Sequence, residues 1–95
     1  MKITLSEDAA KWYEQELALK KGDYVRFFVR YGGNSTIQTG FSLGIQIDEP
    51  ISVGTAITFN GINYYIEETD LWYFDSKELY IQMDQALNEP VFSYT

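Results

Sequence analysis

Apolar residues recur at helical spacing near the N-terminus and alternate with polar residues through most of the remaining chain. Ser6 is a suitable N-cap, and the pattern predicts a helix over about residues 7–19. Lys20, Lys21 and Gly22 are expected to end this helix, because cations suit its negative end and glycine suits a left-handed cap. The predicted buried stripe comprises Ala9, Tyr13, Leu17 and part of Trp12.

Alternation after residue 24 predicts strands that each bury one face. The predicted strands cover residues 24–31, 40–48, 55–59, 62–67 and 79–83. The expected core face of the first strand carries Val25, Phe27, Val29 and Tyr31. Asn60-Gly61 lies between two of these segments and predicts a hairpin with a type I′ turn.

The segment 68–74 lacks alternation, and Thr69 could cap a short helical turn there. Its aromatic residues are expected to fill one end of the sheet, and the residues after Pro90 are expected to form a tail. One helix before about five strands indicates a mainly β fold, a small sandwich or open barrel covered by the helix. A chain of 95 residues supports one core, which predicts a single domain over residues 1–95.

The chain contains no cysteine and no histidine, so it cannot hold zinc or an iron–sulfur cluster through its own thiolates or imidazoles. Its net charge of −7 opposes binding to nucleic acid or to anionic membranes. The charge is explained by solubility or by an acidic patch for a basic partner. The lack of cysteine and of a long apolar run favours a soluble, cytoplasmic protein.

Two neighbouring features could bind an anion or a polar ligand. The loop from Gly32 to Thr36, with Gly33, Asn34 and Ser35, could offer backbone amides and hydroxyls, or it could simply reverse the chain. Arg26 and Arg30 fall on one strand face about 13 Å apart at the usual rise, and could bind a carboxylate or phosphate. The competing interpretation is that these arginines pair with the protein's own acidic residues.

Two further features surround the predicted short helix. A group of four carboxylates around this helix could bind Ca²⁺ or Mg²⁺. Their spacing is not that of an EF-hand loop, so a solvated acidic surface is the simpler interpretation. Trp72-Tyr73-Phe74 cannot all point inward from one turn, so Trp72 is a candidate partner-binding residue as well as a core residue. The carboxylates in question are Glu67, Glu68, Asp70 and Asp75.

The order of elements and several short motifs resemble the HesB-like family, which includes the A-type iron–sulfur carriers. The matching segments are Ile3-Thr4-Leu5-Ser6, Val25-Arg26-Phe27-Phe28, Tyr31-Gly32-Gly33, Gly40-Phe41-Ser42-Leu43-Gly44 and Asn88-Glu89-Pro90. The carriers place one cysteine just after the break that follows the first strand, at or beside Asn34 here, and a Cys-Gly-Cys near the C-terminus. This chain has none of the three, so it looks like a cysteine-free, uncharacterised bacterial branch of the family.

The resemblance implies the HesB-like fold without the cluster site. We therefore expect a non-enzymatic accessory or interaction protein with no cofactor, no catalytic or metal-binding residue and an unidentified protein partner. Its candidate surface comprises Arg26, Arg30, Gly33, Asn34, Ser35 and Trp72. Two alternatives remain open: a small anionic-ligand binder or enzyme using this loop and the arginines, and an iron–sulfur-related protein with ligands supplied by a partner. Either a monomer or a homodimer formed through a strand edge is expected.

Overall fold

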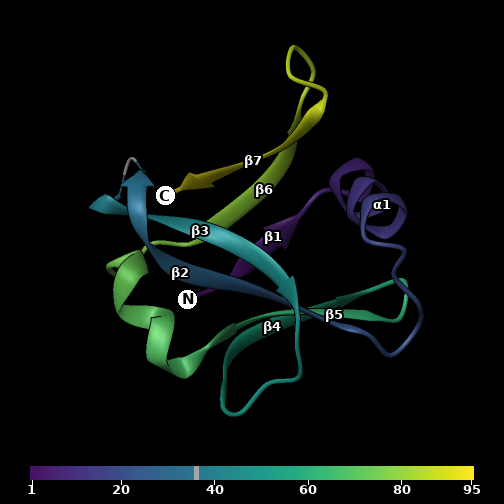
Figure 1. Ribbon diagram of the computed structural model, residues 1–95, viewed down its shortest axis with the longest axis horizontal. Helices are drawn as coiled ribbons and strands as arrows, with labels where there is room; N and C mark the ends of the chain where they lie inside the picture. The colour runs from purple at the N-terminus through teal and green to yellow at the C-terminus, as the bar shows by residue number, and fades with distance from the viewer. Residues whose placement is uncertain (36) are drawn as a thin grey trace.

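The computed structural model describes residues 1–35 and 37–95, which form two open β-sheets, an N-terminal helix and a short 3₁₀ helix (Figure 1). The elements are, in chain order, β1 (Ile3–Leu5), α1 (Glu7–Glu16), β2 (Tyr24–Asn34), β3 (Thr39–Ile47), β4 (Val53–Phe59), β5 (Ile62–Glu67), η1 (Glu68–Phe74), β6 (Leu79–Asp84) and β7 (Glu89–Tyr94). The prediction of a mainly β fold with two helical segments is confirmed. Within the described residues the sheets do not close into a barrel.

The two sheets differ in how their strands are connected. One sheet has the order β3-β2-β5-β4 and joins two antiparallel hairpins through a parallel pairing of β2 with β5. The other has the order β1-β6-β7, with β1 parallel to β6 and β7 antiparallel to it. The expected I′ turn between β4 and β5 is confirmed, because Asn60 and Gly61 both have positive φ angles of 52° and 78°.

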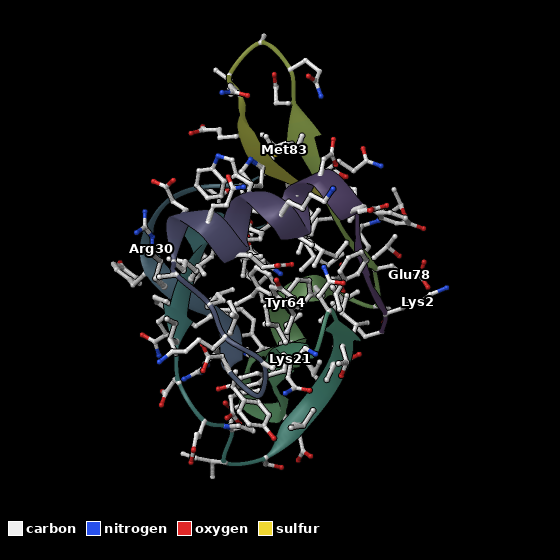
Figure 2. The ribbon with its side chains drawn as sticks, turned by 90° about the vertical axis from the view of Figure 1, so that its right-hand side faces the viewer. Lys2, Lys21, Arg30, Tyr64, Glu78 and Met83 are labelled. Carbon is white, nitrogen blue, oxygen red and sulfur yellow. The ribbon has the colours of Figure 1, made fainter. Side chains whose placement is uncertain are left out.

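Aromatic rings fill the space between α1 and the four-stranded sheet. Tyr13 of α1 packs edge-on against Phe27 of β2 at a centroid distance of 6.0 Å, and Phe27 stacks on Tyr64 of β5 at 6.2 Å. Tyr64 lies in the interior of the molecule in Figure 2, and its burial raises its pKa to about 12, with the charge of Glu14 adding to the shift. The helix is thus fixed by its contacts with the sheet.

Several local predictions were wrong. Ala10, absent from the predicted stripe, is fully buried, whereas Tyr31 is 91% exposed although alternation placed it in the core. The N-terminal residues form β1 and the expected tail forms β7, which pairs with β6 from Glu89 to Tyr94. Thr69 lies inside η1, which begins at Glu68 and has no side-chain cap.

The helix α1 ends earlier than predicted, at Glu16 with Leu17 as the C-cap. The next residue, Ala18, has a φ angle of 51°. Its amide donates to the carbonyl of Gln15, and the amide of Leu19 donates to the carbonyl of Glu14, which is the bonding pattern of a Schellman motif. Gly22, expected as the cap, lies beyond this motif. Ala18 therefore occupies the left-handed position that glycine usually takes.

We predict that Ala18→Gly stabilises the protein by about 0.5 kcal/mol. Relief of the left-handed strain, about 1–2 kcal/mol, exceeds the entropy that glycine adds to the unfolded chain. Urea denaturation would measure the change, with Gly22→Ala as the reciprocal control. Gly22 has a φ angle of 93° and open space around it, so the alanine should cost about 1 kcal/mol from backbone strain alone. An unchanged or lower midpoint for Ala18→Gly would contradict this account.

Candidate functional site

The glycine-rich segment is the bulged end of β2 and not a free loop. Gly32 and Gly33 have φ angles of 111° and 69°, and the pairing of β2 with β3 shifts register between Tyr31 and Asn34. A Cβ atom at Gly33 would lie 3.1 Å from the Oγ atom of Ser42. The bulge thus uses both glycines for backbone geometry, and Gly33 also for close contact with β3.

Ser35 closes the turn that follows the bulge. Its hydroxyl donates to the carbonyl of Gln38 at 3.2 Å and accepts from the amides of Ile37 and Gln38 at 3.4 and 3.1 Å. This is local turn chemistry, which the competing interpretation of the loop anticipated. The side chain of Asn34 and the whole of Thr36 lie outside the described residues.

Arg26 and Arg30 make different contacts. The Nη2 atom of Arg26 donates to Oδ2 of Asp70 at 2.9 Å in a mostly buried ion pair. The Nε atom of Arg30, which lies at the surface in Figure 2, donates to the Oγ atom of Ser42 at 2.9 Å, and that hydroxyl donates to the carbonyl of Gly32 at 3.0 Å. The two arginines do not line a common pocket among the described residues.

The ion pair positions η1 on the sheet. Asp70 belongs to η1, and the distance in sequence from Arg26 is 44 residues. The Oδ2 atom of Asp70 also accepts from the amide of Val29 at 3.5 Å. This pairing fixes one side of η1 against β2 and so determines where the next residues of η1, including Trp72, lie.

Three aromatic residues from three elements meet at the surface beside this ion pair. Phe41 of β3 packs edge-on against Trp72 at a centroid distance of 5.3 Å and against Tyr31 at 5.6 Å. Tyr31 is 91% exposed and Trp72 is 53% exposed, whereas Tyr73 and Phe74 are fully buried. We call Tyr31, Phe41 and Trp72 the aromatic surface. The sequence identified Trp72 as a candidate, but alternation placed Tyr31 in the core.

The four carboxylates around η1 do not converge. Asp70 pairs with Arg26, and Oε2 of Glu68 accepts from the hydroxyl of Ser52 at 3.3 Å. Asp75 is the left-handed C-cap of η1. Among residues 1–35 and 37–95, no group of three or more carboxylates could hold a metal ion.

Glu67 is a buried carboxylate with a structural function. Its Oε1 and Oε2 atoms accept from the amides of Ile51 and Ser52 at 2.7 and 2.9 Å. These two amide bonds lower the pKa of Glu67, burial opposes them, and the charge of Arg26 adds to the lowering. The carboxylate therefore holds the connection between β3 and β4 in a fixed shape.

A pocket of about 550 Å³ lies between β3, β7 and Ser35. Its other lining residues are Ser42, Leu43, Pro90, Val91, Phe92 and Tyr94. The Tyr94 hydroxyl is 3.2 Å from that of Tyr73, and burial followed by this hydrogen bond raises the pKa of Tyr94 above its ordinary value. The described lining residues therefore offer neither a base nor a cation, and the pocket suits apolar contact.

The pocket lies beside the segment at which the resemblance to the iron–sulfur carriers places their first cysteine. Ser35, which follows the β2 bulge, lines it together with residues of β3 and β7. The described lining has no thiolate, imidazole or carboxylate, so these residues do not fit an iron–sulfur cluster. The sequence contains no cysteine that could supply such ligands.

Comparison with known proteins identifies the family. A family model described as iron-sulphur cluster biosynthesis matches residues 1–93. The chain belongs to this family. As a member it departs from the carriers by the absence of every cysteine. Among the residues described, no helix of this family member is long and apolar enough to cross a membrane.

Relatives cover nearly the whole chain. The chain is 51% identical over 94 residues to a protein named pyruvate dehydrogenase inhibitor from Bacillus subtilis (strain 168), covering 99% of both chains. It is 39% identical over 92 residues to an uncharacterized protein of Staphylococcus saprophyticus, covering 94% of each. An uncharacterized protein of Staphylococcus haemolyticus is 34% identical over 96 residues, covering 98% of this chain and 97% of the relative.

We predict that Asp70→Asn destabilises the protein by about 2 kcal/mol, because it leaves the mostly buried guanidinium of Arg26 without a countercharge. The double variant Arg26→Met/Asp70→Asn should recover part of this loss, since the unpaired charge is then gone. Guanidinium chloride denaturation of the wild type, Arg26→Met, Asp70→Asn and the double variant gives the coupling energy. Strictly additive effects would show that the two side chains act independently.

Glu67→Gln should lower the thermal midpoint at pH 7, since one amide oxygen and one NH₂ group cannot accept from both backbone amides. Because the folded-state pKa of Glu67 is lowered, the stability it contributes is present above the ordinary glutamate pKa and is lost as the pH falls through the folded value. The difference between wild type and variant should therefore shrink towards pH 3. Melting curves at pH 7 and pH 3 test this, and a pH-independent difference would contradict it.

Proposed function

We propose that this protein is a non-catalytic regulator that acts by binding another protein, and that its target is pyruvate dehydrogenase. The observation that carries the proposal is the 51% identity, over 99% of both chains, to a relative named as an inhibitor of that enzyme. At this identity and coverage the two proteins share one fold. A non-catalytic function is consistent with a pocket whose described lining residues include no base.

The aromatic surface is the candidate contact region. Exposed tyrosine and tryptophan are the residue types that most often dominate binding energy at protein interfaces. Tyr31 and Trp72 are exposed, yet each is held by an edge-on contact with Phe41, so their ordering costs little on binding. The Arg26–Asp70 ion pair fixes η1, the element that carries Trp72, on the sheet. The surface is therefore formed before a partner arrives.

The experiment is inhibition of purified Bacillus subtilis pyruvate dehydrogenase by the purified protein, followed as the rate of pyruvate oxidation. We expect the wild-type protein to lower the rate saturably. Tyr31→Ser and Trp72→Ser should each raise the concentration for half-maximal inhibition by about tenfold or more, the usual effect of removing an interface hot spot.

Leu87→Ser is the control for these variants. Leu87 is 60% exposed and lies in the connection between β6 and β7, at the top of Figure 1 and remote from the aromatic surface. It should inhibit like the wild type. Circular dichroism would verify that each variant is folded, and Tyr31→Ser is the safer test because the Tyr31 side chain is almost wholly in solvent. No inhibition and no binding by the wild-type protein would refute the proposed function.

A further inference from the structure

A large apolar side chain in the connection between β3 and β4 is almost wholly exposed. Ile51 is 96% exposed, and its neighbours Ile47 and Val53 are 54% and 46% exposed. Figure 1 shows this connection extending below both sheets. We call residues 48–52 the anchor loop. An isoleucine in full contact with water gives nothing to the stability of the free protein.

The anchor loop is nevertheless held at both ends. Near its start, the carbonyl of Asp48 accepts from the hydroxyl of Tyr65 at 2.7 Å. At its end, the amides of Ile51 and Ser52 donate to the carboxylate of Glu67, and the carbonyl of Ser52 accepts from the amide of Glu68 at 2.8 Å. Burying a carboxylate is costly unless it is well bonded. Here the buried charge serves to fix the backbone that presents Ile51.

The chain segment around the anchor loop carries only negative side-chain charges, while the charge of Arg26, which acts on Glu67 from β2, is paired with Asp70. From Tyr31 to Ser76 the chain has no lysine and no arginine, whereas it has six carboxylates. Asp48 and Glu49 belong to the anchor loop, and Glu68 bonds to the Ser52 hydroxyl. A recess of about 330 Å³ beside the loop is lined by Gly22, Asp23, Tyr24, Ile47, Asp48 and Glu49. The exposed Ile51 side chain beside these carboxylates is complementary to an apolar hollow bordered by cations.

We propose that the anchor loop is a preformed binding element that inserts Ile51 into an apolar hollow of the protein partner, bordered there by lysine or arginine side chains that face Asp48 and Glu49. This rests on the proposed function and specifies the chemistry of the enzyme surface that the protein recognises. A second copy of this chain is a poor occupant, because pairing two such loops would bring like charges together.

The anchor loop and the aromatic surface can belong to one interface, because η1 connects them. Glu68, the first residue of η1, bonds to Ser52 at the end of the loop, and Trp72 follows four residues later. The axial rise of a 3₁₀ helix over four residues is roughly 8 Å. Trp72 thus lies a short way along η1 from the residue that bonds to the anchor loop.

The test measures binding of the full-length protein to Bacillus subtilis pyruvate dehydrogenase by biolayer interferometry. Ile51→Ser is expected to raise Kd about tenfold or more, and Ile51→Val less than threefold, because valine keeps most of the apolar tip. Leu87→Ser, the matched exposed leucine, should bind like the wild type. Glu49→Lys should weaken binding at low salt, and raising the salt should weaken the wild type more than this variant.

The outcomes separate the two proposals. If the wild type binds and Ile51→Ser binds with the same Kd, the anchor is overturned while the proposed function stands. If the wild type neither binds nor inhibits the enzyme, both fall. A Glu49→Lys variant that binds as well as wild type would overturn the cationic border. Sedimentation velocity that shows dimers lost on Ile51→Ser would assign the loop to self-association instead.

Discussion

The four-stranded sheet depends on a short parallel pairing at its centre. Three residue pairs, Tyr24 with Asn63, Val25 with Tyr64 and Arg26 with Tyr65, join the β2–β3 hairpin to the β4–β5 hairpin. Each hairpin can form locally, but this pairing must bring together segments about forty residues apart, which costs loop entropy. It stacks Phe27 against Tyr64, and it carries Arg26 to the face where η1 follows β5. The core and both candidate surfaces therefore depend on it.

The fold and its chemistry are separable in this family member. The hollow between β3 and β7 lies beside Ser35, near the position expected for one cysteine of the carriers, yet its described lining is serine, aliphatic and aromatic. A scaffold keeps its core when ligands at one edge are replaced, because those ligands contribute little to packing. The exposed residues that are proposed to contact a partner are Tyr31, Ile51 and Trp72, and they come from other parts of the sheet and its connections. Under the proposed function, these exposed residues bind the partner, and the hollow has no assigned use.

Local sequence patterns predicted the elements that are long enough to show hydrophobic alternation or a complete turn motif. Alternation located β2 to β6, and Asn60-Gly61 located the I′ turn, because these signals lie within a few residues. The strand β1 has three residues, too few to show alternation, and the parallel partners of β1 and β2 leave no local signal. Tyr31 follows the core period but lies at the bulged end of β2, where burial depends on which elements cover it. The sequence offered pairing of Arg26 with an acidic residue as one interpretation, but neither Asp70 as its partner nor Glu67 as a loop tether could be predicted, since both need the tertiary fold.

The tether that Glu67 makes to the anchor loop bears on how quickly a complex forms. A loop that must fold onto its partner loses conformational entropy during binding and often associates slowly. Here that entropy is lost when the protein folds, because the amides of Ile51 and Ser52 are already bonded. The loop then needs no folding during the encounter, and association rates of about 10⁵–10⁷ M⁻¹ s⁻¹ are typical of docking without folding. Small changes to the Ile51 side chain would therefore alter the residence time of such a complex more than its rate of formation.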